Sequence, residues 1–122
     1  MIEIAQVTKD LTACLKKVIE GIYPIGITDE GVALPFVIYT KTGYTEYNVT
    51  KDGRPGCTVM FTISAVSKGY LEGIEIIDGI REKLRKMTGD YKYKVTVDGV
   101  SEEGFDDGFS QTLNISIDVN YY

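Results

Sequence analysis

The segment Thr112-Leu113-Asn114-Ile115-Ser116-Ile117-Asp118-Val119-Asn120-Tyr121 alternates polar and apolar residues without interruption. Successive side chains of a β-strand point to opposite faces of its sheet, so the apolar residues share one face and the polar residues share the other. The pattern predicts a sheet with one dry face and one water-exposed face. A function without chemistry would use the exposed face.

Three further segments complete the expected sheet. Residues 34–40 form a strand whose start is marked by Pro35, because proline lacks the amide donor of a sheet ladder. Residues 58–67 alternate as the last strand does, and residues 93–97 place Tyr93, Val95 and Val97 on one face. These segments predict a four-stranded sheet.

Two segments have the period of an amphipathic helix. In the first, apolar residues recur at spacings of three and four until Gly21 and Pro24 stop the helix. The second runs from the candidate N-cap Ser67 to about Met87, and Gly73 falls on its apolar face, which suggests close approach of that helix to the sheet. The stripe of the first helix consists of Ile4, Val7, Leu11, Leu15, Val18 and Ile22.

The element order is therefore helix, strand, strand, helix, strand, strand. This order predicts an α+β fold with a largely antiparallel four-stranded sheet and both helices packed on one face. With 122 residues, of which 43% are hydrophobic, the chain 1–122 is the size of one domain. No basic start followed by a long apolar run is present, so we expect a soluble, unexported protein with no membrane partner.

The amino-acid composition argues against catalysis, metal binding and nucleic-acid binding. The chain has no histidine, which removes the commonest general base and metal ligand, and Cys14 and Cys57 lack the close spacing of a metal site. We expect buried, reduced thiols, no enzyme activity, no cofactor and no bound metal. A net charge of −5 disfavours specific binding of nucleic acid, which generally needs clustered positive charge.

Two loops are expected to carry the functional surface. Residues 43–56 form a long connection with exposed tyrosines, and residues 98–109 form an acidic, glycine-rich loop. The spacing of the acids departs from calcium-binding loops, so the loop is expected to be solvated. From this loop chemistry we predict that Tyr44, Tyr47, Arg54, Glu102, Glu103, Phe105, Asp106, Asp107 and Phe109 contact other subunits or partners.

The chain resembles a known family. Ile22-Tyr23-Pro24, the stretch 34–39, the strand 59–67, the helical spacing Ile77-X-X-Ile80-X-X-X-Leu84 and the closing strand are together similar to the tail-completion or tail-terminator proteins of long-tailed bacteriophages and prophages. The resemblance covers nearly the whole chain.

The resemblance implies a virion structural protein. Subunits of that family assemble into a ring, usually a hexamer, which caps the finished tail tube and joins it to the head. It implies the major tail tube protein and head–tail connector proteins as partners, DNA passing through the ring, and a location in the virion tail after assembly in the bacterial cytoplasm. The family supplies no catalytic, cofactor or metal residue to match.

Other functions remain open at this point. A head-side connector or neck protein is also a ring of small subunits, and gene order beside a major tail protein would separate the two. A cytosolic adaptor domain of bacterial origin would use the same polar sheet face and would stay monomeric or dimeric at high concentration. An enzyme based on carboxylates would need a deep pocket of acids with perturbed titration.

Overall fold

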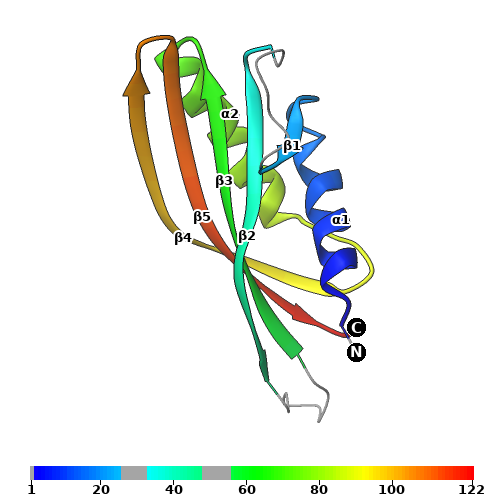
Figure 1. The fold of residues 1–122 in the computed structure, drawn as a ribbon. Helices are drawn as coiled ribbons and strands as arrows, with labels where there is room; N and C mark the ends of the chain where they lie inside the picture. Colours follow the sequence, from blue (N-terminus) through cyan, green and yellow to red (C-terminus); the bar gives the residue numbers. More distant parts are fainter. Residues whose placement is uncertain (1, 26–32, 48–55) are drawn as a thin grey trace.

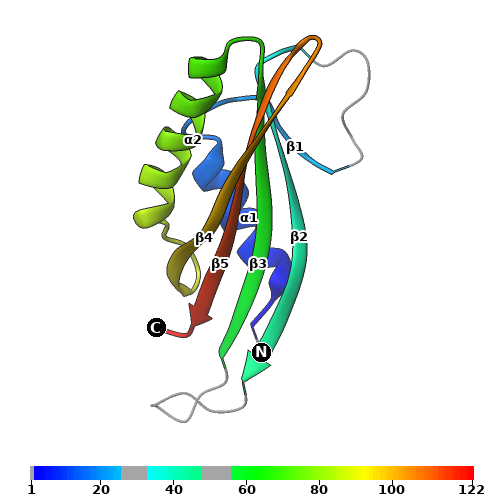
Figure 2. The same ribbon diagram turned by 90° about the vertical axis from the view of Figure 1, so that its left-hand side faces the viewer.

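The computed structural model describes residues 2–25, 33–47 and 56–122. In these residues five strands form one sheet in the order β1-β2-β3-β5-β4, and both helices cover the same face of it (Figures 1 and 2). The elements along the chain are α1 (Ile4–Leu15), β1 (Ile22–Pro24), β2 (Phe36–Tyr47), β3 (Gly56–Ser67), α2 (Tyr70–Arg85), β4 (Lys92–Phe105) and β5 (Gly108–Asn120). The α+β class and the two helices on one face are confirmed.

The additional strand, β1, is the first difference from the expected element order. The helical stripe of the first segment ends with α1 at Leu15, and Ile22 begins β1 instead of closing the helix. β1 pairs in parallel with β2, with Ile22 opposite Val37, whereas all other strand pairs are antiparallel. Ile22 therefore reaches the same core from a strand.

The core lies between the helices and the two central strands. Four alternate residues of β5 are buried, as the alternation predicts, and β3 buries its own set opposite them, with Phe61 paired to Ile115. Helix α2 packs against β3, β5 and β4, and α1 packs against α2. The buried apolar residues of β5 are Leu113, Ile115, Ile117 and Val119.

The approach of α2 to the sheet depends on Gly73. A Cβ at this position would lie 2.7 Å from Ser67 Oγ and 3.1 Å from Gln111 Cγ, so the predicted close contact is confirmed. The predicted N-cap is wrong, because Ser67 is the last residue of β3 and Gly69 caps the helix. Ser67 is fully buried, and its hydroxyl donates to the carbonyl oxygen of Gly69 at 2.7 Å.

A single side chain ties α1 to the turn between α2 and β4. The carboxylate of Asp10 accepts hydrogen bonds from the backbone N–H of Asp90 at 3.1 Å and from the hydroxyl of Tyr93. Burial, followed by this hydrogen bond, raises the pKa of the Tyr93 phenol well above its ordinary value. The carboxylate thus holds the start of β4 against the helical layer.

Two β-bulges lie at the same level of the sheet. Thr42 is the extra residue of β2, between Lys41 opposite Phe61 and Gly43 opposite Met60. Asp98 is the extra residue of β4, between Val97 opposite Ile115 and Gly99 opposite Asn114. Because Phe61 and Ile115 pair with each other, both bulges adjoin one row of the sheet. Bulges bend a strand and increase its twist, which fits the bend of the long strands in Figure 1.

Candidate subunit interface

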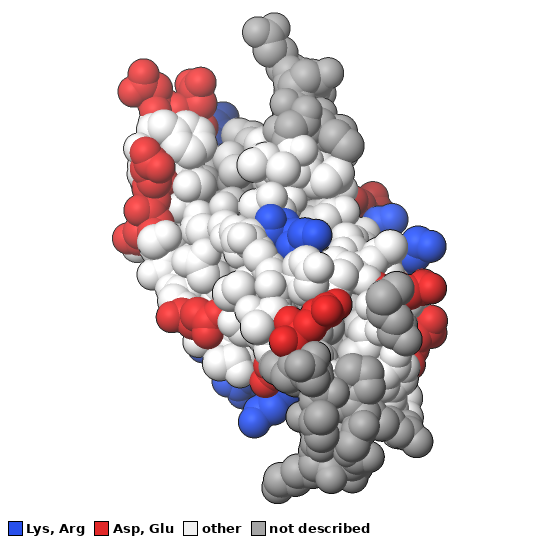
Figure 3. Space-filling model, turned by 60° about the horizontal axis from the view of Figure 1, so that its bottom comes forward, with Lys and Arg blue, Asp and Glu red and all other residues white. Residues whose placement is uncertain are grey.

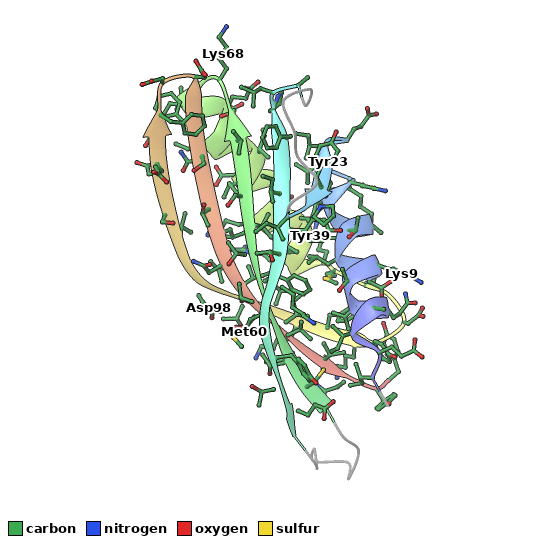
Figure 4. The ribbon with its side chains drawn as sticks, viewed as in Figure 1. Lys9, Tyr23, Tyr39, Met60, Lys68 and Asp98 are labelled. Carbon is green, nitrogen blue, oxygen red and sulfur yellow. The ribbon has the colours of Figure 1, made fainter. Side chains whose placement is uncertain are left out.

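The face of the sheet opposite the helices is polar at its centre. Met60 and Asp98 belong to this face and lie away from the helices (Figure 4). Tyr39 belongs to the other face and points toward α1. Figure 3 shows a broad uncharged area with most of the charged side chains around it. Three side-chain hydrogen bonds join β3 to β5 here: Thr58 to Asp118 at 2.6 Å, Thr62 to Asn114 at 2.9 Å and Ser64 to Thr112 at 2.9 Å.

Within the predicted loop 43–56, residues 43–47 and Gly56 belong to strands, and residues 48–55 lie outside the described residues. The β2–β3 ladder continues to Tyr47 opposite Gly56, because this part of β2 is rich in threonine and tyrosine, which suit a pleated surface. Tyr44 is 50% exposed, and the ammonium group of Lys41 lies 5.7 Å from the centre of its ring. Arg54 lies outside the described residues.

The predicted acidic loop is also wrong, because its residues form a β-hairpin. β4 continues to Phe105, which pairs with Gly108 across a turn made by Asp106 and Asp107. Gly108 is buried, and a Cβ on it would lie 2.3 Å from the carbonyl oxygen of Ser67. The hairpin is thus packed against the β3–α2 connection and does not extend freely into solvent.

The acids of this hairpin diverge. Glu102 pairs with Gln111 on the helical face, whereas Glu103 pairs with Ser110 on the open face. The hydroxyl of Tyr70 donates to the Glu102 carboxylate, and this hydrogen bond raises the pKa of the Tyr70 phenol. In the part of the chain that the structure describes, no three potential metal ligands are grouped.

The aromatic residues of the hairpin differ in exposure. Phe105 is 49% exposed, whereas Phe109 is half-buried and packs edge-on against Tyr70 with ring centres 5.4 Å apart. Phe109 therefore stabilises the hairpin on α2 in the chain itself. Of the predicted hairpin contacts, Phe105, Asp106 and Asp107 remain at the exposed tip.

The predicted contact residues fall into two groups at opposite ends of the sheet. Tyr44 and Tyr47 belong to the end of β2, and the β4–β5 hairpin lies at the other end (Figure 1). The structure does not bring the two groups together into one site. Two separated patches suit a contact in which one end of a subunit meets a different part of its neighbour.

The reactive side chains are withdrawn from solvent. Cys14 on α1 and Cys57 on β3 are both buried and free, and burial raises the pKa of each thiol, which disfavours the nucleophilic thiolate. A mostly apolar groove of about 410 Å³ lies between α1 and the β1–β2 edge, lined by residues that include Ile4, Tyr39 and Phe61. Among the described residues that line this groove, Lys41 is the one charged side chain.

Two exposed residues were not singled out from the sequence. Val97 is 40% exposed and Val100 is 55% exposed, and both lie on the outer strand β4. The break in alternation between them is the signal that could have marked them, since two valines three residues apart cannot share a face of a regular strand. The bulge at Asp98 puts them on the same face.

The geometry defines a small α+β domain with one helical layer, an open polar sheet face and exposed aromatic residues at opposite ends of the sheet. No protein-family model and no curated protein matches the sequence. Among solved structures, the chain is similar to a chain of the virion of a native gene transfer agent (GTA) particle. The TM-score is 0.63 at 13% sequence identity, over 94% of this chain and 92% of that chain. At this identity the likeness shows a shared fold.

Neither helix in the described ranges is long and apolar enough to span a membrane.

Proposed function

We propose that this protein is a structural subunit of a virion. The observation that carries the proposal is the mutual coverage of the fold match, because the shared fold accounts for nearly all of a chain that belongs to a virion. The buried thiols and the divergent acids support a mechanical role over a catalytic one. The polar open face and the two exposed ends supply surfaces for neighbouring subunits.

Within the virion, we propose that the subunits form a ring that terminates or completes the tail and joins it to the head. The resemblance to tail-terminator proteins supports this role, as do the contact patches at opposite ends of the sheet. A contact between different patches repeats around an axis and closes into a ring when the rotation allows it. The ring would meet the major tail tube protein on one side and head–tail connector proteins on the other, with DNA passing through.

The exposed aromatic residues at the two ends of the sheet allow the free energy of each proposed contact to be estimated. Tyr44 and Phe105 are each about half exposed. Aromatic side chains bury 150–250 Å², so covering the exposed half of one ring removes about 100 Å² from water, worth about 2 kcal/mol per contact. A ring repeats such contacts at every interface, so modest contacts suffice.

Electron microscopy of the purified protein, alone, with tail tubes and with heads, tests the proposal. We expect rings on the head-proximal end of the tubes. Tyr44→Ser and Phe105→Ser should each reduce ring formation without changing the melting temperature, whereas Leu71→Ser, which removes an apolar residue 68% exposed on α2, should leave rings intact. Rings found only on the head would support the connector alternative. Absence of any ring with tubes present would refute the proposal.

A further inference from the structure

Strand β4 is a free edge of the sheet. It pairs with β5 on one side, and in the described residues no strand pairs with its other side. The strand has 14 residues, all of them exposed or half-buried. A free edge of this length presents a row of unpaired backbone N–H and C=O groups, which another strand can bind.

The lysines and glutamates of this edge lie at opposite ends, with Asp98 at the bulge between them. Lys92 and Lys94 lie at the start of β4, and Glu102 and Glu103 lie near its end. Charges of one sign along an edge would repel a second copy, but charges of opposite sign at the two ends attract one that runs antiparallel. We propose that β4 pairs antiparallel with β4 of a second copy of this chain, about a two-fold axis between Asp98 and Gly99.

The bulge in β4 makes the faces match in this register. Before the bulge, Lys94 lies on the open face, opposite Asp118 of β5; after it, Glu103 lies on the open face, opposite Ser110. Two-fold pairing about the bulge places Lys94 opposite Glu103 of the partner subunit, and the symmetry repeats the pair. Residues opposite each other in an antiparallel ladder share a face, so each lysine and glutamate meet on the same side.

The exposed valines occupy the centre of the same pairing. Val97 lies opposite Val100 of the partner subunit, so the two-fold axis gathers four valines on the helical face. In the single chain these side chains are 40% and 55% exposed. Cross-strand pairs of β-branched residues stabilise sheets, and pairing also removes this apolar surface from water. The pairing thus accounts for two exposed valines at the centre of this edge.

A groove between α2 and β4 adds a third element of complementarity. It measures about 320 Å³ and is lined by Arg81, Arg85 and Val95 among others. The Nε atom of Arg81 is buried and has no hydrogen-bond partner among the described residues. In the proposed register Glu102 of the partner subunit lies opposite Val95, on the helical face beside these guanidinium groups. A carboxylate has about four lone-pair sites, so its bond to Tyr70 leaves capacity for an arginine.

The pairing uses neither Tyr44 nor the β2–β3 end, but it includes the end of β4 that carries Phe105, so it describes protein outside the ring. A two-fold dimer is closed, because each copy covers the edge of the other and leaves no free β4 to recruit a third. The dimer therefore covers the free edge of β4 while the protein is not yet assembled into a larger structure.

Sedimentation velocity of the full chain tests the inference. The wild-type protein should sediment with twice the 13.5 kDa mass of one chain. Glu103→Lys should raise the dimer dissociation constant about tenfold, because the two-fold axis replaces two attractive pairs with two repulsive ones. Adding Lys94→Glu should restore dimerisation, although Glu at 94 then faces Asp118 within the chain. Val100→Lys should also dissociate the dimer.

Glu20→Lys is the matched control, with the same change of charge at an exposed residue near the opposite edge of the sheet. It should leave the dimer intact. Hydrogen exchange of peptides covering 92–105 should be slower in the dimer than in the Glu103→Lys variant, at equal melting temperatures. A monomeric wild-type protein at high concentration, or an oligomer unaffected by both Glu103→Lys and Val100→Lys, overturns the inference. A wild-type protein that is monomeric in solution and still forms rings on tail tubes would overturn it while leaving the proposed function in place.

Discussion

Replacing Gly73 with alanine tests how closely α2 packs on the sheet. In a solvent-exposed helix the exchange stabilises by about 1 kcal/mol, because alanine has the higher helix propensity. Here the new Cβ would lie 2.7 Å from Ser67 Oγ and 3.1 Å from Gln111 Cγ, both buried residues. Overpacking of this kind costs about 1–3 kcal/mol, so we expect a net destabilisation of about 1 kcal/mol.

A second substitution separates the two effects. Ser67→Ala removes the contacting oxygen, and the Ser67 Cβ lies 3.8 Å from the new Cβ, an ordinary contact distance. Alone, this change loses the hydrogen bond to the Gly69 carbonyl, at about 1 kcal/mol. In the double variant the main steric conflict is gone, so it should be more stable than the sum of the single effects by about 1–2 kcal/mol.

Urea unfolding followed by far-UV circular dichroism gives the required free energies. Gly79→Ala is the reference within the same helix, because it gains the same propensity and meets only a methyl group of Val18, at 3.1 Å. It should be near neutral or stabilising. If Gly73→Ala stabilises as much as Gly79→Ala, or if the Ser67 and Gly73 substitutions are additive, the helix does not approach the sheet as described.

Two further predictions concern titratable groups. The folded-state pKa of Tyr93 is raised above its unfolded value near 10, so its contribution to stability is complete below that pH and is lost as the pH rises beyond it. Urea midpoints between pH 8 and pH 11 should therefore fall less steeply for Tyr93→Phe than for the wild type, and an unchanged slope would contradict the hydrogen bond to Asp10. The thiols of Cys14 and Cys57 should react with a disulfide reagent at least about 100-fold more slowly in the native protein than in urea. Fast native labelling of either would show that its site opens readily.

The central strands and the helical faces could be predicted from the sequence because burial alone determines them. β5 alternates without interruption from Thr112, and its four buried apolar residues from Leu113 to Val119 are the ones that alternation selects. The glycine on the stripe of α2 was informative for the same reason, since a helix interior tolerates glycine at a cost that only close packing repays. Long, periodic segments carry their own information about which side faces the core.

The missed elements depend on partners far away in the sequence. β1 has three residues, and its pairing with β2 is made by backbone groups that every residue possesses. The 98–105 half of β4 contains glycines and glutamates, which have low strand propensity, yet it pairs because β5 presents a complete ladder beside it. The predicted contact surface was affected as well. Glu102 and Phe109 contact Tyr70 within the chain, and only the pairing register of β4 and β5 could have shown these contacts.

The two bulges connect the shape of the subunit to its surfaces. Thr42 of β2 and Asp98 of β4 each add one residue to a strand that flanks the pair β3 and β5, beside the row formed by Phe61 and Ile115, while β3 and β5 pair without interruption. The longer flanking strands can follow this pair only if the sheet bends and twists. At Asp98 the same insertion exchanges the faces of all later residues of β4, which puts Val100 beside Val97 and Glu103 on the face of Lys94. A single extra residue therefore contributes to the bend of the sheet and sets the pattern that fits β4 to its own copy.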